Sequence, residues 1–264
     1  MLLFAAFPAA AQLLGTTARQ SSSGSLKFLA YYQGIADQNL NFSVDGSGTC
    51  TAAPPNGGVA FPCNSSGDIG TKGSGGAGIF KLTWQIAERF QLYGQVGTGD
   101  YSIKVPSTTI ENTLSGDKLG LIFGAGLKAS IVPDTIVNPA IALDLGITRS
   151  HYNFNRISPG GTPGINNGFS QRLELMTYQV AVETSHLFAI KGNWKLEPYG
   201  GVKWTRVQAD LKDLVSGSHA GGQKDTGTPF LGLRIPAEER IAFFGEASFF
   251  DGVHYGGGLE LRFN

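Results

Sequence analysis

The sequence contains no uninterrupted apolar run of the roughly 18 residues that a membrane-spanning helix requires. This absence excludes a helical membrane protein. Cysteine is scarce, with 2 residues in 264, and no spacing of cysteine and histidine indicates a metal site. Charged residues make up only 15% of the chain, and lysine plus arginine balance aspartate plus glutamate at 20 each. A neutral chain exerts no general attraction on nucleic acid, so we expect no nucleic-acid partner. We also expect no metal and no cofactor.

What the sequence does contain is alternation. From Tyr255 to Phe263 every second residue is apolar or glycine, and Glu260 and Arg262 lie between them. Stretches of this kind recur about ten times, with no helical pattern to cover their apolar faces. Strands of about ten residues cross a membrane when they close into a barrel, because closure satisfies every backbone N–H and C=O. The pattern predicts an all-β fold, an antiparallel up-and-down transmembrane β-barrel.

The links between the predicted strands have two lengths. Tight turns are predicted at 87–89, 132–138, 189–192 and 236–239, and long loops at 45–74, 106–116, 153–168 and 213–226. Long loops on one side and short turns on the other are typical of outer-membrane barrels, in which the long loops are extracellular. We count about ten strands, with eight as the alternative if two hairpins are misread.

The two ends of the chain have different characters. Residues 1–11 are apolar and end in three alanines before Gln12, which predicts the remainder of a signal peptide, although no basic segment precedes it. Residues 12–24 are polar and serine-rich and predict a disordered lead-in, and residues 25–264 predict a single barrel domain. The predicted consequence is export.

The two cysteines, Cys50 and Cys63, fall in the first predicted loop, which is rich in glycine, proline and serine. An exported chain meets an oxidising compartment, so we expect a disulfide across this loop. Such a bridge would stabilise the fold by about 3 kcal/mol on the chain-entropy estimate.

The alternation assigns one face of each strand to lipid and the other to the barrel interior. The predicted lipid-facing residues are Phe80, Leu82, Trp84, Leu121, Phe123, Leu143, Val180, Trp204, Leu261 and Phe263. The predicted interior network has mixed charge and consists of Lys81, Lys128, Asp144, Glu183, Glu197, Lys203, Arg234, Glu246, Glu260 and Arg262, with Lys27, Lys118 and Lys195 on the same face. Mixed charges in a narrow barrel pair into a polar plug, because an unpaired buried charge is costly.

Several glycines also lie on the inward face, and they leave two interpretations open. They either open a narrow water path or fit the curvature of a barrel that its side chains fill. These glycines are Gly120, Gly124, Gly126, Gly146 and Gly201. A filled barrel favours a structural or surface-interaction role, whereas an open path favours a narrow porin or channel that lysine and arginine would tilt toward anions.

With alternating strands, unequal loops and the terminal strand Leu259-Glu-Leu-Arg-Phe263, the chain from Leu26 to Asn264 resembles the small bacterial outer-membrane β-barrel proteins. It is similar to the OmpA-like and opacity-type barrels in general form and to the omptins in strand number. The resemblance implies a bacterial outer membrane, surrounding lipid, insertion by the barrel-assembly machinery and an extracellular partner for the long loops. One departure is Asn264, since the assembly signal of these families usually ends on the aromatic residue.

An outer-membrane protease is the remote alternative. It would require histidine and carboxylates gathered at the extracellular rim to activate water. The rim candidates are His151, His219, His254, Asp100, Asp210, Asp213 and Asp251. None of the local motifs of the omptins surrounds them, so we expect no catalytic residues and no enzyme.

Overall fold

The computed structural model describes Leu14 and residues 17–51, 60–105, 111–160, 170–190, 194–215, 219–249 and 252–263. For residues 41–51 and 60–69 it describes the backbone alone. The predicted signal segment, residues 1–11, lies outside the described residues.

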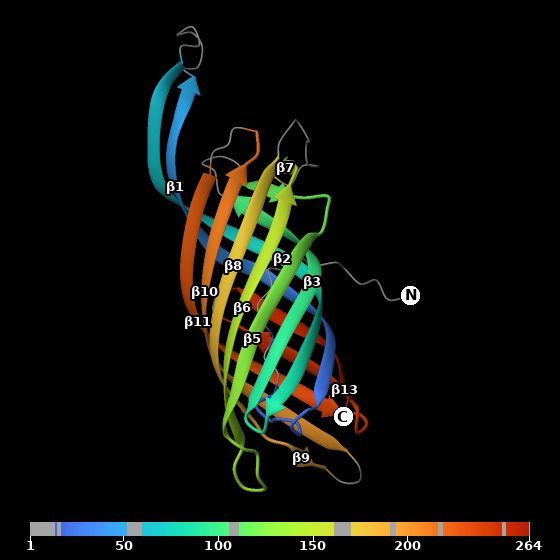
Figure 1. Cartoon of the computed structure of the whole chain (residues 1–264). Coiled ribbons are helices and arrows are strands. Elements are labelled where there is room, and N and C mark those ends of the chain that lie inside the picture. The colour runs from blue at the N-terminus through green and yellow to red at the C-terminus, as the bar shows by residue number, and fades with distance from the viewer. Residues whose placement is uncertain are drawn as a thin grey trace.

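Ten long strands build the molecule (Figure 1). They are β1 (Leu26–Thr51), β2 (Ala60–Ala87), β3 (Phe90–Val105), β5 (Gly120–Val132), β6 (Ala140–Phe154), β8 (Gln171–Ser185), β10 (Lys195–Asp213), β11 (His219–Pro236), β12 (Ile241–Ser248) and β13 (Val253–Phe263). Three short strands, β4 (Asn112–Ser115), β7 (Arg156–Pro159) and β9 (Phe188–Ala189), lie in the links. In the described part of the chain, no helix is long and apolar enough to cross a membrane.

The ten long strands form a closed antiparallel ring. Each pairs with its neighbour along the chain, and β1 pairs with β13 from Leu26 opposite Phe263 to Ala36 opposite Val253. The closing pair therefore joins the first and last strands. The fold class and the number of ten strands are confirmed, and the alternative of eight is wrong.

The first long link differs from the prediction. Residues 45–74 were expected to form a loop, but β1 continues to Thr51, β2 begins at Ala60, and the two remain paired as far as Thr51 opposite Ala60. The pairing could not be predicted because this segment is rich in glycine, serine and proline, which are typical of loops. A two-stranded ladder depends on backbone hydrogen bonds, however, and each of these residues except proline can donate one. We call the eight register pairs from Val44–Gly67 to Thr51–Ala60 the outer ribbon.

The outer ribbon extends past the ring (Figure 1). The pairing of β2 with β3 ends at Lys72 opposite Lys104, and β1 pairs with β11 at Phe42 and Ser43. Eight further residues of strand correspond to about 26 Å at 3.3 Å per residue. The ribbon therefore projects from the end of the barrel opposite Leu26 and Phe263.

A bulge in β1 changes which residues face inward. Between Ile35 and Gln38 the register with β2 shifts, and Asp37 adopts a positive φ of 56°. Ile35 is buried before the bulge, and Gln38 and Leu40 are buried after it, so the inward parity changes from odd to even. The tip between β12 and β13 lies against this bulge, since a Cβ on Gly252 would be 2.3 Å from the carbonyl oxygen of Ala36. Only glycine fits there.

Candidate functional site

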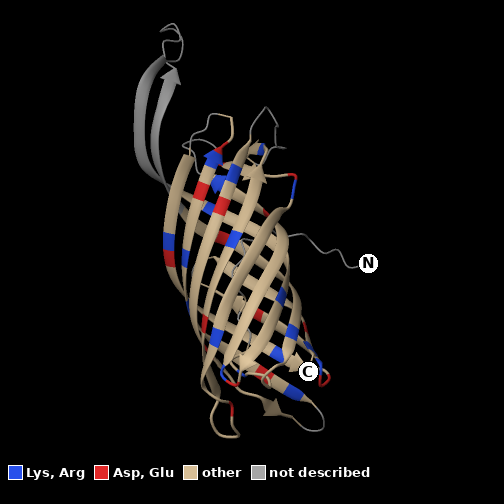
Figure 2. Cartoon of the chain, viewed as in Figure 1, with Lys and Arg blue, Asp and Glu red and all other residues tan. Residues whose placement is uncertain are grey.

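The barrel interior divides into two halves along the barrel axis. We call the half near Leu26 and Phe263 the inner half, and the half toward the outer ribbon the outer half. The inner half is lined with charged side chains, whereas the outer half is lined with apolar and aromatic side chains. Positive and negative residues are interspersed along the strands rather than separated by sign (Figure 2).

Lys128 on β5 is the centre of the first charged cluster. Its side chain is fully buried and its Nζ forms ion pairs with Glu183 on β8 and with Asp144 on β6, the latter at 3.5 Å. The hydroxyl of Tyr93 donates to Asp144 Oδ1 at 2.6 Å, and the Nζ of Lys81 lies 3.9 Å from the centre of the Tyr93 ring. Five strands, β2, β3, β5, β6 and β8, thus contribute side chains to one cluster in the interior.

Arg234 on β11 forms the second cluster, closer to the chain ends. Its guanidinium donates to Glu197 on β10 at 2.9 Å and to Glu260 on β13 at 2.7 Å. Arg262 lies 3.8 Å from Glu260. This arrangement satisfies both buried carboxylates from a single fork-shaped donor.

Lys203 and Glu246 form a third pair, at 3.0 Å and almost fully buried. All ten residues of the predicted interior network therefore lie on the inward side of the wall, and their charged groups contact one another or, for Lys81, an aromatic ring. Lys27 is also buried. Lys118 and Lys195 are exposed instead, because Lys118 precedes β5 and Lys195 begins β10, where the alternation no longer encloses a side chain.

The outer half was not predicted from the sequence. Its inward side chains form one apolar cluster that spans the interior. Members include Ile35, Leu40, Ile79, Tyr101, Ile103, Ile122, Tyr152, Phe154, Leu173, Leu175 and Val207. The short strands add Leu114 from β4 and Ile157 from β7. A signal was present in the sequence: the parity that points Asp144 inward also points Tyr152 and Phe154 inward.

Leu14 and Ala18, which precede β1, lie inside the ring. Leu14 is 4% exposed and belongs to the apolar cluster, and its carbonyl oxygen accepts a hydrogen bond from Lys81 at 3.4 Å. Ala18 packs against Ala140 and Ala142, and the amide of Arg19 donates to Ser185 Oγ at 3.1 Å. These residues belong to the predicted lead-in, residues 12–24, and the inner wall supplies them with both apolar and polar partners.

Tyrosine rings cover inward glycines. A Cβ on Gly126 would lie 2.2 Å from the Tyr93 ring, and one on Gly120 would lie 2.4 Å from the Tyr152 ring. Gly232, which the sequence did not single out, is covered in the same way by Tyr199. These three glycines therefore make room for the large rings of their neighbours.

The outward faces carry the apolar belt. Eight of the predicted lipid-facing residues are exposed, with fractions from 38% for Val180 to 54% for Phe80, Leu121 and Phe263. Leu143 and Leu261 are partly covered by their neighbours. A ring with apolar side chains on its outside and ion pairs on its inside is arranged for lipid around it.

The two cysteines lie in the outer ribbon, in strands rather than in a loop. Cys50 is opposite Phe61 and Cys63 is opposite Gly48, so the two cysteines occupy diagonal positions in the register. Diagonal neighbours are about 7–8 Å apart, farther than the Cα spacing of roughly 4.4–6.8 Å that a disulfide requires. Their side chains lie outside the described part of the structure, and the disulfide stays a prediction that would need a local shift of register.

Among the described residues, the rim histidines do not form one cluster with the rim carboxylates. His151 faces outward on β6 and lies 3.2 Å from Glu174, which also accepts from Arg149. His254 is buried inside the wall. Asp251 lies outside the described residues, and in the described part no group of three His, Cys, Asp or Glu could hold a metal ion.

These features define an outer-membrane β-barrel, so the sequence-based resemblance to that class is confirmed. Residues 64–235, more than half of the chain, match the family described as the autotransporter beta-domain. The chain belongs to this family, and its place is the bacterial outer membrane. A comparison with curated proteins finds no match.

Solved structures with a similar course of the chain include three outer-membrane proteins. The translocator domain of autotransporter NalP from Neisseria meningitidis is 10% identical, with 92% of this chain and 89% of that chain covered and a TM-score of 0.47. The beta domain of the Bordetella autotransporter BrkA is 9% identical, with coverages of 91% and 100% and a TM-score of 0.46. OprG from Pseudomonas aeruginosa is 10% identical, with coverages of 94% and 100% and a TM-score of 0.43.

Proposed function

We propose that this protein is a closed outer-membrane barrel that presents the outer ribbon to a partner outside the cell. The outer ribbon carries the proposal, because two paired strands continue for eight register pairs past the last contact with the ring. A strand at the edge of a sheet offers backbone N–H and C=O groups to an extended segment of another protein. The proposed partner is therefore a protein that adds a strand, and the protein has no catalytic role.

The filled interior supports a contact role over transport. The ion-pair clusters, the apolar cluster and the residues that precede β1 all occupy the interior. A barrel of about eight to ten strands is narrow enough for side chains to fill it. Insertion by the barrel-assembly machinery belongs to the same proposal.

A deletion tests the proposal. Removing residues 46–65, which joins Asp45 to its register neighbour Ser66, shortens the ribbon and removes both cysteines. We expect the barrel still to fold, as judged by a gel mobility that changes on boiling, and cells that carry it to lose adhesion to one another and to cultured epithelial cells. Deleting residues 161–168 from another outer link is the matched control. Unchanged adhesion after the ribbon deletion would refute the proposal.

A narrow channel is the second candidate. The observation that favours it is the segment before β1, whose Leu14 and Ala18 occupy the interior without belonging to the wall. If this segment were displaced, the charged inner half would be accessible to ions. Planar-bilayer conductance of the whole protein and of a Leu14→Asp variant distinguishes the two: the contact role predicts no steady conductance in either.

A further inference from the structure

The outer ribbon has two free edges. Among the described residues, β1 last pairs with β11 at Ser43 and β2 last pairs with β3 at Lys72, so neither strand has a second neighbour in the ribbon. In an antiparallel ladder, successive residues of a strand direct their N–H and C=O groups to opposite sides. Every second residue of each strand is therefore turned toward a free edge.

Hydrogen bonds beside the start of the ladder identify the residues on the β2 edge. The N–H of Gln85 donates to the carbonyl oxygen of Ser25, and the carbonyl oxygen of Gln85 accepts from Gly24. Odd-numbered residues of β2 therefore face β1. The register shift between Ile35 and Gln38 adds a residue to β1 and not to β2, so this parity continues along β2. In the outer ribbon, the residues on the β2 edge are Ala60, Pro62, Asn64 and Ser66.

The same register shift determines which residues lie on the β1 edge. After the shift, even-numbered residues of β1 lie opposite odd-numbered residues of β2, as Gly48 lies opposite Cys63. The even-numbered residues therefore direct their backbone groups to β2, and the odd-numbered residues direct theirs away from it. The residues on the β1 edge are Asp45, Ser47, Thr49 and Thr51.

A proline interrupts the β2 edge but not the β1 edge. Pro62 has no N–H, and its place on the free side of β2 leaves the pairing with β1 intact. Proline on an exposed edge is one of the features that prevent another strand from pairing there. On the β1 edge, all four residues have both an N–H and a C=O group. The β1 edge is therefore the one that is open to an added strand.

We propose that the β1 edge pairs with the β1 edge of a second copy of this protein on a facing cell. The inference rests on the proposed contact role and names the partner. Two identical edges complement each other when they run antiparallel, because hydrogen-bonded residues then lie directly opposite one another. Centred on Gly48, the pairing places Ser47 opposite Thr49 of the other copy and Asp45 opposite Thr51 of the other copy.

The sequence of the edge fits this pairing. Asp45 is the only charged residue from 45 to 51, and the pairing does not place it opposite a second carboxylate. Glycines at 46 and 48 add no side chains between the two copies.

The direction of the strands fits a contact between cells. The outer ribbon projects from one end of the barrel (Figure 1). Two ribbons that pair antiparallel therefore have their barrels at opposite ends of the shared sheet. Barrels arranged in this way lie in membranes that face each other, and many such contacts between two cells add up through multivalency.

The main experiment compares two prolines at the same height in the ribbon. Ser47 and Asn64 lie opposite each other, but Ser47 is turned to the β1 edge and Asn64 to the β2 edge. The whole protein is placed in phosphatidylcholine vesicles that carry either a donor or an acceptor dye, and energy transfer measures vesicle clustering. We expect clustering with the wild type and with Asn64→Pro. Ser47→Pro should weaken the pairing about tenfold, because each copy loses one backbone donor.

Charge substitutions test the register of the pairing. Thr51→Asp places a carboxylate opposite Asp45 of the other copy and should lower clustering, whereas Thr51→Lys places a cation there and should raise it. Both effects should shrink at high salt. Because these substitutions keep every backbone donor, they test the proposal even if Ser47→Pro does not fold.

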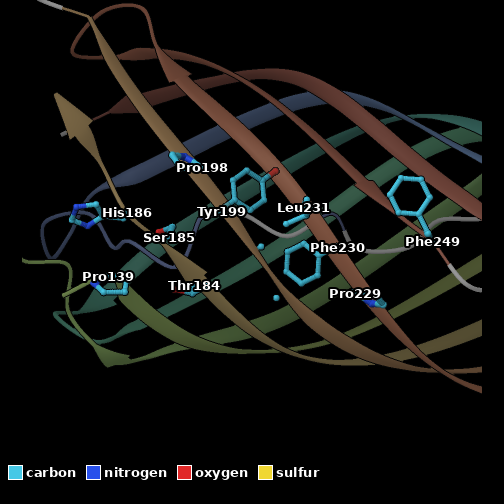
Figure 3. A pocket seen from close by; sticks show the side chains of 12 residues that line it. Pro139, Thr184, Ser185, His186, Pro198, Tyr199, Pro229, Phe230, Leu231 and Phe249 are labelled. Carbon is cyan, nitrogen blue, oxygen red and sulfur yellow. The ribbon is translucent and has the colours of Figure 1, made fainter. Parts of the chain in front are cut away.

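A cross-link tests which residues meet. In a background of Cys50→Ser and Cys63→Ser, Gly48→Cys should form a disulfide with its counterpart in the other copy. Gly48 faces its own β2, so the two copies meet there as a non-hydrogen-bonded pair, with a Cα spacing of about 4.5 Å that a disulfide can bridge. The control is Thr184→Cys, an exposed position on the lipid-facing side of β8 that Figure 3 labels, which should not cross-link.

Gel mobility before and after boiling checks that each variant folds. Equal clustering by Ser47→Pro and Asn64→Pro would overturn the proposal, as would a failure of Gly48→Cys to cross-link in clustered vesicles. Wild-type vesicles that do not cluster would also overturn it. If deletion of residues 46–65 still abolished adhesion to epithelial cells in that case, the contact role would stand with a different partner.

Discussion

The inner and outer halves of the interior are enclosed by the same wall of alternating strands, but their contents differ. In the inner half, Lys128 and Arg234 each form ion pairs with two carboxylates from other strands. In the outer half, Ile103, Tyr152 and Leu173 belong to one apolar cluster and have almost no exposure. Alternation therefore specifies which residues point inward, and the identity of those residues decides how the space is filled.

The two halves also show two ways of filling the interior of a barrel, one with ion pairs and one with apolar side chains. Ion pairs fix the positions of strands. The attraction between their charges offsets the cost of removing them from water only if every charge has a partner. Apolar side chains exclude water without such matching. We therefore expect the inner half to be the more sensitive to a single substitution and the outer half to be the seal against solutes.

The largest effect is expected from Lys128→Met. The substitution leaves Asp144 and Glu183 buried without their shared cation, which should lower the free energy of unfolding by about 4 kcal/mol. Urea unfolding in lipid vesicles, followed by tryptophan fluorescence, measures the loss. The double variant Lys128→Met, Glu183→Gln removes one charge of each sign, keeps Asp144 beside Tyr93 and Lys81, and should recover most of the stability. A single variant as stable as the wild type would contradict the assignment of this cluster.

An intermediate effect is expected from Phe154→Ala in the outer half. The ring is 1% exposed, so its removal should leave a cavity and cost about 3 kcal/mol. The matched control is Phe123→Ala on the lipid face, where the ring is 49% exposed and lipid fills the vacated space. The same unfolding measurement applies. If both variants lost equal stability, the apolar cluster would not be a packed core.

The smallest effect is expected from Arg206→Gln. Arg206 pairs with Asp225 through two hydrogen bonds of 2.7 and 2.9 Å, a better geometry than that of Lys128 and Asp144, but both side chains are 39% exposed. Water and salt screen an exposed pair, so we expect no measurable change in the unfolding midpoint at physiological salt. A loss comparable with that of Lys128→Met would mean that burial is not what separates the two kinds of pair.

The sequence predicted the ring and the charged inner half because both follow from period-two alternation. Phe80, Leu82 and Trp84 alternate with Lys81 and Thr83, and this alternation alone distinguishes the two sides of the wall. The charges then marked the inward side. The fold class therefore follows from local pattern with little tertiary information.

The remaining features depend on contacts that alternation does not encode. The outer half was missed because inward apolar residues such as Tyr152 do not contrast with outward ones. The outer ribbon was read as a loop because its glycines and serines have low strand propensity, although β1 and β2 pair regardless. The burial of Leu14 depends on Lys81 and the apolar cluster, which lie far from it in sequence.

The pairing of β1 with β13 has a consequence for the order of folding. The ring cannot close until the last strand is present, so the longest-range contact in the chain is also the one that completes it. Leu14 and Ala18 come directly before the strand that closes the ring, yet they lie inside it. The simplest route is for this segment to lie along the inner face of an open sheet and to be enclosed when β13 joins β1.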